Sequence, residues 1–111
     1  MRSILVIDCG SSSMRGVLFG ESGEIRHVER RSYFMDIDGS AATQDAAVYR
    51  ESLISICAAC AQIVRREKLT LGALSITSQR SSVLPVDQAG RPLGKIITWY
   101  DRRSQDICQE K

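Results

Sequence analysis

Short apolar runs separated by polar breaks open the chain, and they precede its one long amphipathic stretch. Residues 4–7 are apolar, rich in β-branched side chains and bounded by Asp8, a pattern typical of a strand inside a sheet. A turn rich in Gly and Ser follows, and a second strand then runs to Phe19. After a turn at residues 20–23, residues 24–35 are expected to form a third strand. The chain is therefore predicted to begin with three strands joined by tight turns.

One helix dominates the middle of the chain. Residues 36–43 are small and polar, which favours a loop, and Asp45 is a good N-cap for a helix that continues to about Glu67. Apolar side chains recur at helical spacing and define one face for packing on the sheet. They are Tyr49, Leu53, Ile56, Cys57, Cys60, Ile63 and Val64. Residues 71–77 are short and apolar, and a strand that follows a helical crossover is expected to run parallel to the first strand.

The last third of the chain is predicted to add a hairpin and a helix. Residues 83–86 are expected to pair with residues 95–99, with Pro85 placing this hairpin at the periphery, and Asp101 is expected to cap a helix that begins at Arg102. The order β-β-β-α-β predicts an α/β fold with a mixed sheet, the opening of a ribonuclease-H-like domain. The first turn joins two strands, which argues against the Rossmann fingerprint and the Walker P-loop, since each needs a strand-to-helix turn.

Composition and charge narrow the class of protein. The 111 residues suffice for one domain, and the 43% apolar and 25% charged fractions are those of ordinary soluble domains. A net charge of +2 gives no reason to expect nucleic acid or an anionic membrane surface as a partner. No window approaches the length of a transmembrane helix, and the N-terminus lacks the pattern of a signal peptide. We therefore expect a cytoplasmic protein with no membrane partner.

The four cysteines, Cys9, Cys57, Cys60 and Cys108, are not spaced like a secreted disulfide framework. Cys57 and Cys60 have the CxxC spacing of some metal and redox sites. A zinc site needs further ligands, and His27 is the only histidine. A thioredoxin-like motif begins a helix after a strand, whereas this pair lies within the apolar helix face. Buried free cysteines are the better interpretation.

The turn after the first strand carries the most distinctive chemistry. Gly10 permits a backbone path closed to residues with a Cβ atom, and Ser11, Ser12 and Ser13 bring hydroxyls and free N–H groups to the tip. Convergent N–H groups bind anions, and Asp8 beside them can hold a cation through water. These features suggest a magnesium–nucleotide phosphate site. A simple serine-rich hairpin is the alternative, since short motifs often match by chance.

Three segments together resemble the FGGY carbohydrate kinases, whose fold belongs to the actin/hexokinase/Hsp70 superfamily. Residues 8–15 resemble the first phosphate motif of that family, an Asp-x-Gly-Thr/Ser run that ends in Arg or Lys. Gln44-Asp45, at the start of the long helix, resembles the family's acidic or Gln-Asp step. Residues 76–80 and 97–103 resemble its sugar-side motifs. The order and spacing of the three are more specific than any one alone, and the resemblance covers essentially the whole chain.

The resemblance implies a role for each matching residue. Asp8 would lie near Mg²⁺, held through water, and near the transferred phosphoryl group. The nucleotide-phosphate residues implied are Asp8, Gly10, Ser11, Ser12, Ser13 and Arg15, and the sugar or polyol residues are Gln79, Arg80, Trp99 and Asp101. A polyol needs fixed donors and acceptors and a flat apolar wall, which such side chains supply. The alternatives are that Trp99 only fills the sheet and that Arg80 only pairs with Asp101.

Two departures from the family patterns leave the substrate open. Ser81 follows Gln79-Arg80 where glycerol kinases usually have Glu, which puts glycerol in doubt. Xylulokinases usually have Met-His in place of Gln79-Arg80, so xylulose is not secured either.

The function implied by the resemblance is ATP-dependent phosphorylation of a sugar or polyol hydroxyl, with ATP and Mg²⁺ as cofactors. Residues 1–111 would be the N-terminal part of the first kinase domain, with the catalytic Asp and the adenine site beyond residue 111. This piece alone is therefore expected to be inactive, and its exposed sheet edges make a homodimer possible. The alternative is a nucleotide-dependent switch ATPase of the actin/Hsp70 type, which needs no sugar pocket. A ribonuclease-H-like nuclease is disfavoured because the fourth strand ends in Thr77-Ser78, without a carboxylate.

Overall fold

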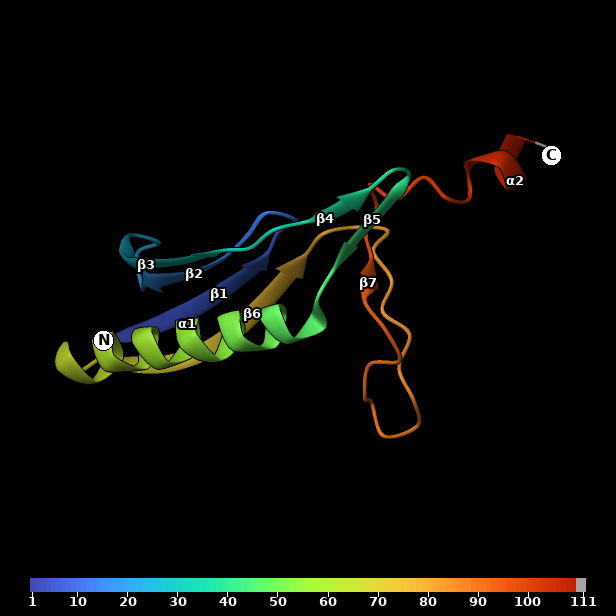
Figure 1. Cartoon of the computed structure of the whole chain (residues 1–111). Helices are drawn as coiled ribbons and strands as arrows, with labels where there is room; N and C mark the ends of the chain where they lie inside the picture. Colours follow the sequence, from blue (N-terminus) through green and yellow to red (C-terminus); the bar gives the residue numbers. More distant parts are fainter. Residues whose placement is uncertain (110–111) are drawn as a thin grey trace.

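The computed structural model describes residues 1–109 and contains a four-stranded mixed sheet covered on one face by a long helix (Figure 1). The sheet order is β3-β2-β1-β6. β1 pairs antiparallel with β2 and parallel with β6, and β2 pairs antiparallel with β3. The strands are β1 (Arg2–Cys9), β2 (Ser13–Gly20), β3 (Ile25–Ser32) and β6 (Thr70–Ser78). The three opening strands and the parallel fourth strand are confirmed.

Helix α1 (Ala46–Arg66) forms the second layer. Asp45 caps it, because its side chain accepts a hydrogen bond from the Ala47 N–H at 2.9 Å, as the sequence predicts. The apolar stripe of the helix packs on the inner faces of β1 and β2 and excludes water there. The buried core consists of Leu5, Ile7, Met14, Leu18, Tyr33, Ile56, Cys60, Ile63 and Leu69. Cys60 is thus a buried free cysteine, with Cys57 packed against the same core.

The segment at residues 36–43 is not a loop, and here the prediction was wrong. It contains strands β4 (Asp36–Asp38) and β5 (Ala41–Gln44), which form a hairpin, and β5 also pairs with β7 (Ile96–Ile97). The composition is polar and small, but the partner strand lies more than fifty residues away. The Ala42 carbonyl accepts hydrogen bonds from both Thr98 N–H and Thr98 Oγ1. Long-range pairing has overridden the local preference.

The distal hairpin forms, but only as two isolated bridges. Val83 and Ile97 exchange N–H···O bonds of 2.9 and 2.8 Å, and Val86 opposes Pro92. β7 uses its other edge to pair with β5, so this segment joins two hairpins into a small second sheet. Figure 1 shows it projecting from the end of the main sheet at which β1 and β6 finish. The molecule is consequently elongated, with extents of 57 × 28 × 23 Å.

The final helix begins later than expected. Helix α2 spans Gln105–Gln109, so Asp101 is not its N-cap. The oxygens of Asp101 instead accept hydrogen bonds from the Ala42 and Arg103 N–H groups and from the Arg103 guanidinium. The residue that precedes α2 is Ser104, three positions beyond Asp101, so the Asp101 carboxylate is not at the N-cap position.

The expectation that no segment reaches transmembrane length also needs correction. Helix α1 is long and apolar enough to cross a membrane by length and composition alone. Its packing against β1, β2 and β3, with Ile56, Cys60 and Ile63 buried, is that of the helix layer of this fold. Length and composition by themselves are weak evidence when such a helix has a sheet to pack on.

Candidate functional site

The turn between β1 and β2 is closed by a single short-range hydrogen bond. The Gly10 N–H donates to the Ser13 carbonyl at 3.0 Å. A Cβ atom at Gly10 would lie 2.8 Å from that same oxygen, which is closer than such contacts can be. Glycine is needed at this position for close approach, whereas its φ angle is not among the left-handed ones. The prediction that a Cβ atom is excluded is confirmed, with this contact as its cause.

All four carbonyl oxygens of the turn accept hydrogen bonds from protein groups. The pairs are the Tyr33 hydroxyl on Gly10, Gln44 Nε2 on Ser11 at 2.6 Å, the Tyr33 N–H on Ser12 at 3.0 Å, and the Gly10 N–H on Ser13. By contrast, the N–H groups of Ser11 and Ser12 have no acceptor within residues 1–109. A turn with fixed carbonyls and open N–H groups is suited to binding an anion.

Asp8 and Arg15 lie side by side on the face of the main sheet that points away from α1. They are register partners in β1 and β2, and Arg15 Nη2 donates to Asp8 Oδ2 at 3.0 Å. Since Ile7 on the same strand faces α1, alternation places Asp8 on the face away from the helix. The side chains are 37% and 45% exposed, respectively, so this is a solvated pair of modest strength.

Asp8 also fits the cation that the resemblance implies. A single carboxylate, completed by water and substrate phosphates, is a common way for proteins to bind Mg²⁺. Within residues 1–109 no group of three or more His, Cys, Asp or Glu side chains could hold a metal ion. Asp8 therefore suits a Mg²⁺ ion that arrives bound to a nucleotide better than a metal ion held permanently by protein ligands.

A group of three polar side chains, of which Gln44 is buried and the other two are half-buried, lies between the turn and the end of β6. We call Gln44, Tyr49 and Gln79 the amide–tyrosine cluster. The Tyr49 hydroxyl lies 2.6 Å from Gln44 Oε1 and 3.3 Å from the Gly10 carbonyl oxygen, and it accepts a hydrogen bond from Gln79 Nε2. Burial raises the pKa of the Tyr49 hydroxyl, so it stays neutral and able to donate at physiological pH.

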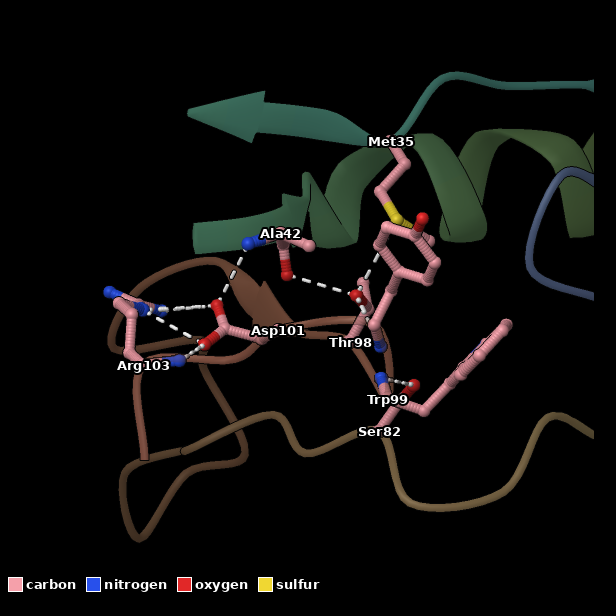
Figure 2. A network of polar contacts seen from close by, with 8 residues as sticks. Met35, Ala42, Ser82, Thr98, Trp99, Asp101 and Arg103 are labelled. Atoms are coloured by element: carbon pink, nitrogen blue, oxygen red, sulfur yellow. Dashed lines mark hydrogen bonds and ion pairs between the residues drawn. The ribbon is translucent and has the colours of Figure 1, made fainter. Parts of the chain in front are cut away.

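The cluster extends to the distal hairpin through Ser82. The Ser82 hydroxyl donates to Gln79 Oε1 at 2.9 Å. It also accepts a hydrogen bond from the Trp99 N–H at 3.1 Å, which Figure 2 shows. The Trp99 ring is half exposed and meets Tyr100 edge to face, with centroids 5.5 Å apart. Trp99 thus does not fill the main sheet, contrary to the alternative considered from sequence.

Asp101 is held tightly by its own chain. Figure 2 shows its carboxylate between the Ala42 N–H, at 2.8 Å, and the Arg103 side chain, with Nη2 at 2.9 Å. The side chain is only 6% exposed. Hydrogen bonds from Arg103 and then from the Ala42 N–H lower the pKa of Asp101 to about 2, so it is ionised at neutral pH. The partner of Asp101 is Arg103 and not Arg80, so the alternative that Arg80 only pairs with Asp101 is wrong.

The four residues assigned to a sugar differ in their contacts. Trp99 and Asp101 line a hollow of about 510 Å³ together with Arg103. Gln79 belongs to the amide–tyrosine cluster instead, and Arg80 is exposed, with no hydrogen bond or ion pair to another described residue. The structure therefore places Trp99 and Asp101 on one hollow and links Gln79 to the Trp99 N–H through Ser82, while Arg80 makes no such contact to a described residue.

Sequence reasoning missed the residues that hold the turn. The sequence pattern places Tyr49 on the packing face of the helix and Tyr33 in the third strand, with no partner for either hydroxyl. The available signal was the hydroxyl itself, because a buried tyrosine almost always has a hydrogen-bond partner. Gln44 was noted for its resemblance to the family but was given no contact.

Comparison with known proteins supplies the family. The model of the N-terminal domain of the FGGY family of carbohydrate kinases matches residues 3–111. The glycerol kinase of Stenotrophomonas maltophilia is 32% identical over 122 residues, covering 97% of this chain, and that of Bordetella pertussis is 29% identical over 109 residues, covering 96%. The chain spans 22% of the length of each of these relatives.

Solved structures show the same fold. The Plasmodium falciparum glycerol kinase with ADP superposes with a TM-score of 0.90 at 23% identity, over 99% of this chain and 22% of that one. The xylulose kinase of Rhodospirillum rubrum superposes with a TM-score of 0.91 at 20% identity, over 98% of this chain and 22% of that one. Because the family model matches residues 3–111, which is nearly the whole of this chain, the chain belongs to the FGGY family of carbohydrate kinases.

Proposed function

We propose that the protein containing this chain transfers the terminal phosphoryl group of ATP to a hydroxyl group of a sugar or polyol. The observation that carries the proposal is the β1–β2 turn, whose carbonyls are all occupied while the Ser11 and Ser12 N–H groups are open. Phosphoryl transfer depends mainly on positioning and charge neutralisation, and such a turn supplies both.

On the nucleotide side, the proposal gives each residue of the turn a part. Gly10, Ser11, Ser12 and Ser13 face the phosphates, and Arg15 adds positive charge beside them. Asp8 holds Mg²⁺ through water, and the cation, when bound, neutralises charge that develops on the phosphates. Asp8 keeps one carboxylate oxygen free of Arg15, which supports this assignment.

On the substrate side, the proposal uses the hollow beside Trp99. The half-exposed indole offers a flat wall to the C–H face of a sugar. Asp101 lines the hollow, but its carboxylate is already bound by Arg103 and Ala42, so it shapes the site more than it offers free acceptors. Arg80 is free to donate, and Gln79 reaches substrate only by breaking contacts that it makes in the cluster.

The remaining parts of the proposal concern the whole protein. Residues 1–111 form the N-terminal part of the first kinase domain, and the base that accepts the proton of the attacking hydroxyl lies outside them. The protein works in the cytoplasm, as expected of a metabolic kinase. Within residues 1–109 the outer edge of β6 is unpaired, so pairing with a second copy through this edge is proposed for this piece alone and not for the whole protein.

The test is a substrate screen with the full-length protein that contains this chain. ADP release is measured with ATP, Mg²⁺ and glycerol, pentuloses or hexuloses in turn, and the phosphorylated product is identified. Release that depends on one class of polyol supports the proposal. ATP binding or slow hydrolysis that no sugar accelerates would overturn it in favour of a switch ATPase. The variant Trp99→Ala tests the sugar side of the proposal. It is expected to raise the KM for the sugar and to leave the KM for ATP unchanged.

A further inference from the structure

We infer that Gln44 is a positioning residue that aims the N–H groups of the phosphate turn at their ligand, an inference that rests on the proposed function. Gln44 lies at the end of β5 and is 3% exposed. Its backbone is held by pairing with Ile96 of β7, and its side chain reaches across to the turn. Gln44 Nε2 lies 2.6 Å from the Ser11 carbonyl oxygen. This is the only side chain among residues 1–109 that binds that carbonyl.

The hydrogen bond from Gln44 to the Ser11 carbonyl also sets the direction of the Ser12 N–H, because both groups belong to one planar peptide group. In a trans peptide the C=O and N–H bonds point in opposite directions, and no peptide bond of the described chain is cis. Fixing the Ser11 carbonyl toward Gln44 therefore fixes the Ser12 N–H away from it. Tyr33 does the same for the preceding peptide group, because its hydroxyl on the Gly10 carbonyl directs the Ser11 N–H outward. The donors come from buried side chains, so the free N–H groups face the open side of the turn.

An amide suits this position because two different demands meet there. The Ser11 carbonyl needs a donor, whereas the Tyr49 hydroxyl, 2.6 Å from Gln44 Oε1, needs an acceptor. Glutamine supplies one of each at the end of a single side chain. Methionine has nearly the same length and supplies neither. Ionised glutamate supplies only the acceptor and brings negative charge to the back of an anion-binding turn.

The test compares the kinetics of Gln44→Met with those of wild type in the full-length protein. Losing a hydrogen bond that orients the turn is expected to raise the KM for ATP roughly 2- to 10-fold while leaving the KM for the sugar unchanged. Ile56→Val, which removes one methylene group from the core beside β2, is the matched stability control. It is expected to lower the melting temperature without changing either KM. A purely structural role for Gln44 would resemble this control, because loss of folded protein lowers the apparent kcat and not the KM.

The outcomes separate this inference from the proposed function. An unchanged KM for ATP in folded Gln44→Met, or an equal rise in both KM values, overturns the inference alone. If Gln44→Met does not fold, Gln44→Glu takes its place with the same criterion, since it keeps the acceptor for Tyr49. Direct titration with ATP completes the set. Wild type that binds ATP but phosphorylates no polyol refutes the proposed function, and weaker ATP binding by the variant then still supports the inference. Wild type that does not bind ATP overturns both.

Discussion

Replacing Gly16 by alanine tests how closely α1 approaches the sheet. Gly16 lies in the middle of β2, and a Cβ atom there would lie 2.3 Å from Ile56 Cγ2. The same atom would lie 3.5 Å from both Cys60 Sγ and Ile7 Cδ1, so it has no free direction in which to move. Ile56 is fully buried, and a β-branched side chain in a helix has one strongly preferred rotamer. The clash is relieved only if helix and sheet separate by about 1 Å, the difference between 2.3 Å and the 3.4 Å of ordinary contact.

Two opposing effects set the sign of the change. Without a clash, alanine would stabilise a strand by about 0.5–1 kcal/mol relative to glycine, because it has less conformational freedom to lose. Overpacking a filled core costs about 1–3 kcal/mol. We therefore expect Gly16→Ala to lower the free energy of unfolding by about 1–2 kcal/mol, and the melting temperature by about 4–8 °C for each kcal/mol.

A double-mutant cycle in urea isolates the contact. Ile56→Ala alone is expected to cost about 2–5 kcal/mol, since it leaves a cavity above β2. In that background the methyl group introduced by Gly16→Ala partly fills the cavity, so the substitution becomes neutral or stabilising, with a coupling energy of about 1–3 kcal/mol. Effects that add within about 0.5 kcal/mol, or a Gly16→Ala protein more stable than wild type, would refute the close approach.

Three further predictions concern the site. Gly10→Ala places a Cβ atom 2.8 Å from the carbonyl oxygen across the turn, so we expect it to raise the KM for ATP by about tenfold, and an unchanged value in steady-state kinetics would contradict the turn geometry. Asp101→Asn removes a carboxylate whose pKa Arg103 lowers from 3.8 to about 2. A carboxylate with a lowered pKa stabilises the fold at pH values above its pKa in the unfolded chain, and this stabilisation is lost as the pH falls through its pKa in the folded protein. The difference in melting temperature between wild type and variant should therefore be constant from pH 7 to about 5 and should close as the pH falls from about 4 to 2. A gap that persists at pH 2 would show that charge is not its cause. Arg15→Gln frees Asp8 and removes a positive charge, so ATP titrations should show weaker binding with a smaller dependence on salt, and an unchanged salt dependence would limit Arg15 to its ion pair.

The main sheet and its helix could be predicted because their signals are local. The alternation along β1 and β2, the Asp45 cap and the helical spacing through Ile63 each act within a few residues. The hairpin of β4 and β5 has no such signal. Its residues are small and polar, and they become strands only because Thr98 and Ile96, far along the chain, supply partners.

The same limit explains what was missed in the site. The turn itself was recognisable from Asp8, Gly10 and the serines, all neighbours in sequence. Its supports were not, because Gln44 lies on β5, which the sequence does not reveal as a strand, and Tyr49 lies on a helix face that looks purely apolar. A single hydroxyl on such a face has its partner defined by tertiary structure alone.

Gln79 shows how the two halves of the site are connected. The resemblance assigns it to the sugar pocket, but its amide nitrogen donates into the cluster that holds the turn, and its oxygen accepts from Ser82, which in turn binds the Trp99 N–H. Within residues 1–109 no buried side-chain nitrogen or oxygen lacks a hydrogen-bond partner. Gln79 is only half-buried, so water replaces a contact that a small shift of the turn breaks, and the effect of Gln44→Met is expected to stay on the ATP side. The contacts that hold the β1–β2 turn and those that hold the backbone of Trp99 thus meet at one glutamine side chain.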